Sequence, residues 1–124
     1  LTTTGHSHIW EVSRGALTEH DLDPRDLGIP RARMEDLIGG TPDENAAVVR
    51  RVLAGEPGPV RDIVLLNAAA GLVAFDLMMN PEAADRPILG RLGEQLRIAA
   101  EAVDSGAAAE KLAVWAESSS AFAR

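Results

Sequence analysis

Two histidines near the start of the chain are the first residues whose spacing could support chemistry. His6 and His8 are two positions apart, so on a β-strand both imidazoles would point to one face and could share a metal ion. Further ligands would have to be brought in by the fold from His20, Asp21, Asp23 and Asp26. Two histidines without a nearby third ligand are more often polar edge-strand positions, and that is the interpretation we favour.

The densest run of charge, Glu19 to Asp26, could be imagined as a general acid/base cluster. Acidic residues ahead of a turn are more commonly a solvated loop, so we predict a loop here. The serines lack the neighbours of a nucleophile: neither Ser105 nor Ser118 to Ser120 has a histidine and an acid arranged as its base would be.

Gly39-Gly40 precedes a predicted helix and is the one place where a phosphate could be cradled, because free N–H groups and the positive end of the helix dipole converge there. Pro42 removes one donor, and Thr41 and Glu44 occupy others as a capping box. We therefore predict that the glycines only let the chain turn sharply into the helix.

Asn67 is the polar residue of a long apolar segment, and an unpartnered buried amide costs about 1–3 kcal/mol. We predict that it bonds to backbone in a neighbouring loop. Arg61 and Asp62 lie near the start of the same helix, where the dipole favours the carboxylate. Structural roles are the favoured interpretation for all three, so the sequence assigns no catalytic, substrate-binding or metal-binding residue.

The elements that position these residues begin with strands. His8, Trp10 and Val12 alternate with their neighbours, and a second extended run covers 16–22, which together predict a hairpin turned at Ser13 to Gly15. Prolines then indicate an irregular connection. A short helix is predicted over 31–38.

From Thr41 onward the pattern is helical. The first predicted helix begins at Pro42, stops at Gly55 and has Ala46, Val49 and Leu53 on one face. The second, over 60–77, is apolar nearly all round and belongs in the middle of the fold. The third covers about 87–103, and the fourth follows Ser105-Gly106. The last two carry apolar stripes predicted to pack on each other, at Leu89, Leu92, Leu96, Ala99 and Val103 and at Ala108, Leu112, Trp115 and Phe122.

Composition limits the class of protein. The chain has 124 residues, enough for one domain and too few for two, and its net charge of -7 makes nucleic acid and anionic membrane surfaces unlikely partners. The run Ile63 to Phe75 is short of the roughly 20 residues of a membrane span, and the start has no signal-peptide pattern. The absence of Cys fits a cytoplasmic location.

Four blocks in order resemble the C-terminal part of the anthranilate phosphoribosyltransferase family. They are Leu-Thr-Thr-Thr-Gly at 1–5, Ile-Trp-Glu-Val at 9–12, Gly-Gly-Thr-Pro-Asp-Glu-Asn-Ala at 39–46 and Gly-Pro-Val-Arg-Asp-Ile-Val-Leu-Leu-Asn-Ala-Ala at 58–69. Asp-Ser-Gly-Ala at 104–107 fits the end of that family. The resemblance covers the whole chain, and the order and spacing of the blocks make it specific.

The resemblance implies transfer of the phosphoribosyl group of phosphoribosyl pyrophosphate to the amino nitrogen of anthranilate, with Mg²⁺, in tryptophan biosynthesis. It implies a helix-rich, mixed α/β fold with a front β-hairpin followed by about four helices. It also implies a small helical N-terminal domain elsewhere in the enzyme, and a homodimer.

The family's Asp-Glu metal-binding pair and Gly-rich loop precede the region that Leu1 begins, so the Mg²⁺ ligands are expected upstream of Leu1. We therefore expect 1–124 to be a single partial domain. It should be inactive alone, and its hairpin edges should invite self-association. Thr2, Thr3 and Thr4 are assigned no role. Two alternatives remain: a nucleoside phosphorylase of related architecture, and a stand-alone helical interaction module whose Leu and Trp stripes bind a partner.

Overall fold

A two-stranded hairpin followed by four α-helices makes up the part of the chain that this computed structural model describes, residues 1–122. The elements are β1 (Ser7–Ser13), β2 (Ala16–Leu22), α1 (Pro42–Leu53), α2 (Pro59–Met79), α3 (Ile88–Asp104) and α4 (Ala107–Phe122), with short 3-10 helices η1 (Pro24–Leu27), η2 (Met34–Leu37) and η3 (Pro81–Asp85). The predicted helix-rich α/β class is confirmed. The assignment of 1–124 to one partial domain stays a prediction.

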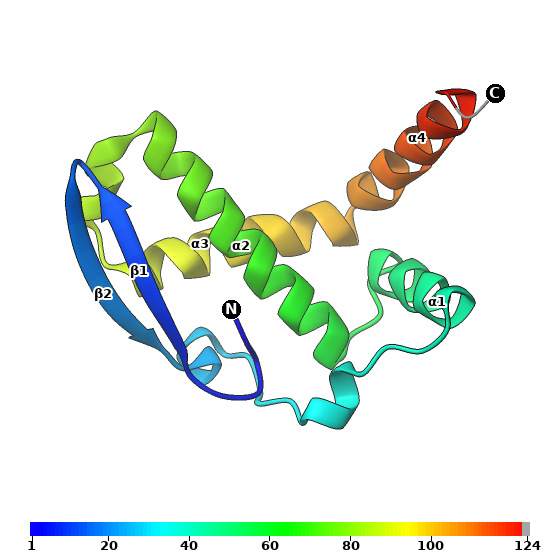
Figure 1. The fold of residues 1–124 in the computed structure, drawn as a ribbon, viewed down its shortest axis with the longest axis horizontal. Helices are drawn as coiled ribbons and strands as arrows, with labels where there is room; N and C mark the ends of the chain where they lie inside the picture. The colour runs from blue at the N-terminus through cyan, green and yellow to red at the C-terminus, as the bar shows by residue number, and fades with distance from the viewer. Residues whose placement is uncertain (123–124) are drawn as a thin grey trace.

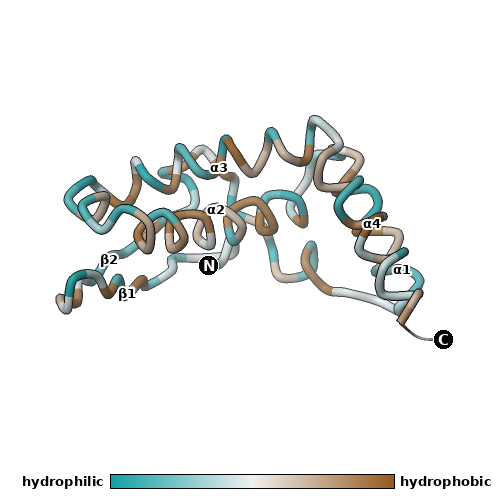
Figure 2. The backbone as a smooth tube through the Cα atoms, turned by 90° about the horizontal axis from the view of Figure 1, so that it is seen from above, coloured by the Kyte–Doolittle hydropathy of each residue, from teal (hydrophilic) through white to brown (hydrophobic). Residues whose placement is uncertain are grey.

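The elements fall into a layered half and a peripheral half. The hairpin, α2 and α3 form successive layers with α2 in the middle (Figure 2). At the other end, α1 and α4 extend away from these layers (Figure 1). We call the first group the layered half and the second the peripheral half.

The hairpin is closed by a two-residue turn. β1 and β2 are antiparallel, with Ser13 opposite Ala16 and Ser7 opposite Leu22. Arg14 and Gly15 both have positive φ, 51° and 78°, as the turns that match the strand twist require. The predicted hairpin is confirmed, and its first strand starts at Ser7.

The predicted start of α1 is confirmed, and its predicted apolar face is partly buried at Ala46 and Leu53. The Thr41 hydroxyl accepts a hydrogen bond from the Glu44 N–H at 3.4 Å, and the Glu44 carboxylate accepts one from the Thr41 N–H at 2.7 Å. Val52 is the buried residue of this helix, whereas Val49 is half exposed.

The helix predicted over 31–38 is reduced to the four residues of η2. Asp36 accepts a hydrogen bond from the Arg33 N–H at 3.0 Å, which caps this single turn. The chain leaves it in an extended conformation at Ile38, before the glycine expected to end it. The i→i+3 hydrogen bonds of a 3-10 helix have poorer geometry than those of an α-helix, so such helices stay short.

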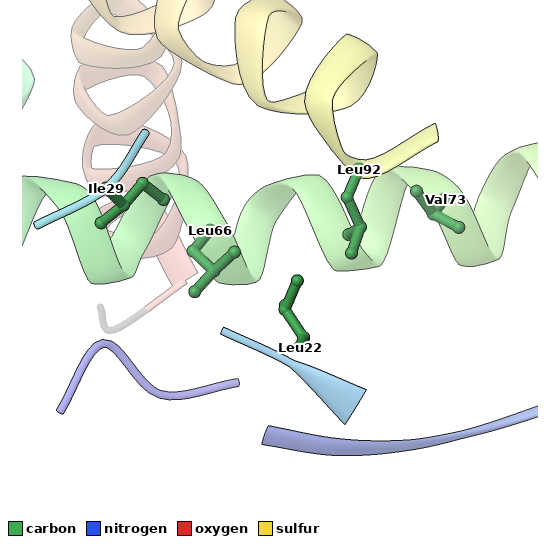
Figure 3. Close-up of a cluster of buried hydrophobic side chains, with 5 residues drawn as sticks. All are labelled: Leu22, Ile29, Leu66, Val73 and Leu92. Atoms are coloured by element: carbon green, nitrogen blue, oxygen red, sulfur yellow. The ribbon is translucent and has the colours of Figure 1, made fainter. Parts of the chain in front are cut away.

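Two clusters of buried side chains hold the layers together. The first joins the hairpin and the following loop to α2 and α3 (Figure 3), through Leu22, Ile29, Leu66, Val73 and Leu92. The second joins α2 to the C-terminal half of α3 through Leu65, Ala99 and Val103. Both clusters include α2, which confirms that this helix belongs in the middle of the fold.

The apolar run in α2 is part of a longer helix than the sequence indicated. Over residues 1–122, α2 is the helix whose 21-residue length and composition would allow it to cross a membrane. The length argument against a membrane span was therefore wrong, because residues 59–62 and the residues after Phe75 extend the helix beyond the apolar run. Only 22 % of its apolar window is buried, so much of its apolar surface is uncovered.

The stripe predicted on α3 is confirmed where it meets α2, while that on α4 is not. Leu92, Ala99 and Val103 are buried. In α4 no described residue is buried, and Trp115 and Phe122 are 66 % and 93 % exposed. The two stripes meet only at the start of α4, where Ala108 packs on the second cluster. Beyond it α4 diverges from α3 (Figure 1), so the expected packing of the stripes is wrong.

Candidate functional site

An apolar groove lies along β1. It has a volume of about 520 Å³ and lies between residues 9–13 of β1, together with Arg14 of the turn, and the side of α2 that carries Ala70, Val73, Ala74 and Leu77. Ile88 and Leu92 of α3 close its base. Few polar groups line it, so the groove is suited to holding an apolar segment and offers no set of acid and base groups.

A buried ion pair fixes the hairpin beside this groove. The Arg91 guanidinium donates to a Glu11 carboxylate oxygen at 2.7 Å and to the Arg86 carbonyl at 3.0 Å, although Arg91 is only 3 % exposed. His20 Nε2 lies 3.7 Å from the same Glu11 oxygen. Sequence reasoning missed this pair, because a charge on an apolar helix stripe gives no sign of a partner 80 residues away.

A second, polar recess of about 380 Å³ lies between η1 and the helices α2 and α3. Arg61, Asp62 and Arg97 line it above an apolar base. Arg61 is already engaged: its guanidinium donates to both Asp104 carboxylate oxygens, at 2.8 and 3.0 Å, and to the Gly55 carbonyl at 3.0 Å. Burial raises the pKa of Asp62 while the neighbouring Arg61 opposes the rise. The two hydrogen bonds from Arg61 to Asp104 connect α2 to α3. A structural role for Arg61 was predicted, but this partner was not.

Asn67 bonds to backbone, as predicted, although its side chain is exposed. Its amide donates to the Leu1 carbonyl and to the Ile63 carbonyl, both at 2.9 Å, and its oxygen accepts from the Leu1 nitrogen at 2.5 Å. These bonds hold the first residue against α2. The predicted backbone partners of Asn67 are therefore correct. The cost of burying its amide, from which they were predicted, does not apply, because the side chain is exposed.

The three histidines do not come together. His8 lies on the exposed face of the hairpin, with Nδ1 2.9 Å from Asp21 and Nε2 3.0 Å from Glu19. Hydrogen bonds that the Asp21 and then the Glu19 carboxylate accept from the imidazole raise the pKa of His8. His6 precedes β1 and lies 3.5 Å from Asp23, and His20 faces Glu11 instead. The idea that the first two share one strand face is therefore wrong.

Asp23 corrects the prediction that residues 19–26 are a solvated loop. Asp23 is buried and caps η1, accepting from the Arg25 N–H at 3.0 Å and from the Arg25 and Arg31 guanidinium groups at 2.7 and 2.8 Å. These bonds, first those of the Arg25 side chain, hold the pKa of Asp23 far below its ordinary value. The rest of the run supplies exposed hairpin and loop carboxylates, such as Asp26.

The glycine pair turns the chain, as predicted, and its donors are taken by side chains. Asn45 accepts from the Gly40 N–H at 2.9 Å and donates to the Gly40 carbonyl at 3.0 Å. A β-carbon at Gly40 would collide with the Glu44 carboxylate. A side chain at Gly40 would displace the Glu44 carboxylate from this cap, and the N–H groups of Gly40, Thr41 and Glu44 are occupied by side chains, which argues against a phosphate cradle.

The hydroxyl groups serve local backbone contacts. The Ser119 and Ser120 hydroxyls donate to the Ala116 carbonyl, and that of Ser105 lies 3.5 Å from the Ala107 nitrogen. Thr2 and Thr4 bond to each other at 2.8 Å. Thr3 is fully buried, its carbonyl accepts from the Ala32 N–H at 3.0 Å, and its hydroxyl has no partner.

The described residues also do not fit a magnesium site. Mg²⁺ needs oxygen ligands converging in near-octahedral geometry. Within residues 1–122 no three acidic or histidine side chains converge on one point. The two least exposed carboxylates with a salt bridge, those of Asp23 and Glu11, are each bonded to arginine.

The comparisons with known proteins agree with one another. Residues 1–109 match the family model described as glycosyl transferase family, a/b domain. The anthranilate phosphoribosyltransferase of Clavibacter sepedonicus is 70 % identical over 116 residues, which is 94 % of this chain and 33 % of that protein. The protein of the same name from Thermobifida fusca is 52 % identical over 124 residues, 100 % of this chain and 34 % of that protein.

A solved structure gives the same result for the fold. The crystal structure of anthranilate phosphoribosyltransferase from Thermus thermophilus matches with a TM-score of 0.64 and 38 % identity, covering 86 % of this chain and 28 % of that one. The chain thus spans about a third of the length of the relatives it matches.

Proposed function

Because the chain belongs to the glycosyl transferase family with the a/b domain, we propose that it works as part of an anthranilate phosphoribosyltransferase. The observation that carries the proposal is the 70 % identity to the Clavibacter sepedonicus enzyme across 94 % of the chain. Each of the three relatives named above carries the transferase name, which favours this activity over that of a nucleoside phosphorylase.

In the proposed reaction, the bond between ribose C1 and the pyrophosphate oxygen breaks. A bond from C1 to the anthranilate nitrogen forms, and that nitrogen loses a proton. Negative charge builds on the leaving pyrophosphate, so the site needs cations and N–H donors around it. Mg²⁺, when bound, would supply part of the positive charge that offsets the charge on the leaving group. The residues described here hold no such constellation, so we assign them to the scaffold.

As a scaffold, the described residues hold two segments of the chain in place. Asn67 holds Leu1 to the middle of α2, and Asp23 with its two arginines fixes the loop behind η1. Residues that act on phosphoribosyl pyrophosphate, anthranilate and Mg²⁺ then come from the part of the enzyme that this chain does not span. Homodimer formation and a cytoplasmic location are further parts of the proposal.

The test is complementation. The chain is mixed with a separately expressed polypeptide that contains the remainder of the Clavibacter sepedonicus enzyme, and consumption of anthranilate is measured with phosphoribosyl pyrophosphate and Mg²⁺. We expect no turnover above the blank for either part alone, and turnover when both are present. Turnover by this chain alone would contradict the scaffold assignment. Failure of all mixtures, with binding of the two parts demonstrated, would contradict the activity.

A further inference from the structure

His8 occupies a position of the hairpin where side chains of the two strands come close together. In an antiparallel pair, residues bonded to the partner strand alternate with residues whose N–H and C=O point away from it, and side chains at the second kind of position are closer. Because Ser13 and Ala16 close the turn, His8 and its partner Asp21 are a pair of the second kind, with Glu19 as a diagonal neighbour. The outward amides of β1 are those of His8, Trp10 and Val12.

Both nitrogens of the His8 ring are engaged by carboxylates of β2. Nδ1 lies 2.9 Å from Asp21 Oδ1, and Nε2 lies 3.0 Å from Glu19 Oε2. Trp10 meets the ring edge to face, with the ring centroids 4.9 Å apart, which helps to hold its orientation. An ionised carboxylate only accepts hydrogen bonds, and a neutral imidazole has one N–H. The two bonds can therefore form together only when His8 carries a proton on each nitrogen.

The proton on His8 also balances the charge of this face of the hairpin. Glu19 and Asp21 are two positions apart on β2, so their carboxylates project from the same face. Within residues 1–122 neither carboxylate forms an ion pair with any cation other than His8. When His8 is neutral, one of the two carboxylates faces a ring nitrogen that has no proton to donate, and the two negative charges are left close together.

We propose that His8 is a pH-dependent link between the two strands, which holds the hairpin closed when protonated and lets it open more often when neutral. The inference does not depend on the transferase activity. Hydrogen bonds to Asp21 and then to Glu19 raise the pKa of His8 above its ordinary value of 6.5. The link is therefore complete below that value and is lost as the pH rises through the raised one. The change falls near neutral pH, where few other side chains titrate.

The two other histidines face different carboxylates. His6 lies 3.5 Å from Asp23, ahead of β1, and His20 lies 3.7 Å from Glu11 on the inner side of the hairpin. His6→Gln is the matched control for His8→Gln, because both side chains are at least 40 % exposed and both variants remove one imidazole from the same end of the hairpin.

Hydrogen exchange of the hairpin, followed by NMR, tests the link. Ile9 and Glu11 are bonded to β2, so their amides report the opening of the hairpin. After correction for the intrinsic effect of pH on exchange, their protection should fall about two- to fivefold between about pH 6 and 8.5. We expect His8→Gln to abolish this fall and His6→Gln to keep it. An equal fall in His8→Gln and in the parent chain would overturn the proposal.

Titration of the His8 ring gives a readout that leaves this residue in place. Nitrogen NMR should show protons on both ring nitrogens in mild acid, and a midpoint above 6.5 in the parent chain. Asp21→Asn and Glu19→Gln should each lower that midpoint, the first by more, because its bond has the larger effect. A midpoint that stays the same in both variants would mean that the carboxylates do not hold the proton, and would also overturn the proposal.

Discussion

The layered half and the peripheral half of this molecule are built from equally regular helices, yet they bury very different amounts of side chain. α2 and α3 contribute eight buried residues to the fold, whereas α1 contributes Val52 alone and the described part of α4 contributes none. Figure 2 shows apolar residues on α4 as well as on α2. An apolar stripe therefore indicates that a helix can be buried. Whether it is buried depends on the elements that lie next to it.

The difference also separates two kinds of contact. The layered half is tied across long sequence separations, by the Arg91–Glu11 pair and the buried clusters. The peripheral half relies on local devices, such as the Thr41–Glu44 capping box. Stability should therefore be concentrated in the first half, and substitutions can measure that difference.

The largest effect is expected from Arg91→Met, because it leaves the Glu11 carboxylate buried without its partner. Losing one member of a buried pair costs about 3–5 kcal/mol in the free energy of unfolding. Urea denaturation measures it. The double variant Glu11→Leu with Arg91→Met is the control, since removing both charges should recover most of that loss. A double variant no more stable than the single one would show that the packing of the Arg91 stem matters more than its charge.

Leu66→Ala should follow, with a loss of about 2–5 kcal/mol, because Leu66 is fully buried where α2 meets the hairpin and the loop behind it. The same denaturation experiment measures the change in midpoint. Val64→Ala on the exposed side of α2 is the matched control and should cost far less. Equal losses at the two positions would mean that α2 is covered on both sides in solution.

How far the sequence predicts this structure depends on how local each cause is. The hairpin turn and the start of α1 follow from Arg14-Gly15 and from Thr41 with Glu44, whose effects act over a few residues. Asp23 and Arg91 are buried because each binds a partner outside its own element, Arg31 and Glu11 respectively. Trp115 is exposed because no described element covers that side of α4. The candidate site followed the same rule: the roles of Asn67 and the glycine pair were predicted, while the groove could not be, because it arises only when β1 is laid beside α2.

Acid should destabilise the fold by protonating Asp23, which lies in the loop that follows β2. The pKa of Asp23 is lowered in the folded chain, chiefly by the Arg25 side chain, so its contribution to stability is complete above its unfolded value near pH 4. That contribution is lost as the pH falls below this value and the carboxylate is protonated. Asp23→Asn should flatten the loss of stability between about pH 4 and 2, as followed by circular dichroism. Asp26→Asn, at an exposed position, is the control. An unchanged acid slope for Asp23→Asn would place the acid-sensitive contact elsewhere.

The smallest effect is expected in the peripheral half, from Trp115→Ala. This large side chain is 66 % exposed on α4, so its removal should change the free energy of unfolding by less than about 0.5 kcal/mol. Tryptophan fluorescence of a Trp10→Phe variant, which reports Trp115 alone, should show a water-exposed indole. A loss of more than about 1–2 kcal/mol would mean that α4 packs on something in solution.

Native-state hydrogen exchange, read residue by residue on the chain alone, tests the contrast between the two halves most directly. We predict that amides of α2 and α3 around Leu66 and Leu92 exchange only through global unfolding, and that those of α4 around Trp115 exchange through local opening. The outward amides of Trp10 and Val12 should be among the fast ones of the hairpin. Protection of α4 equal to that of α2, or slow exchange along the outward edge of β1, would contradict this account.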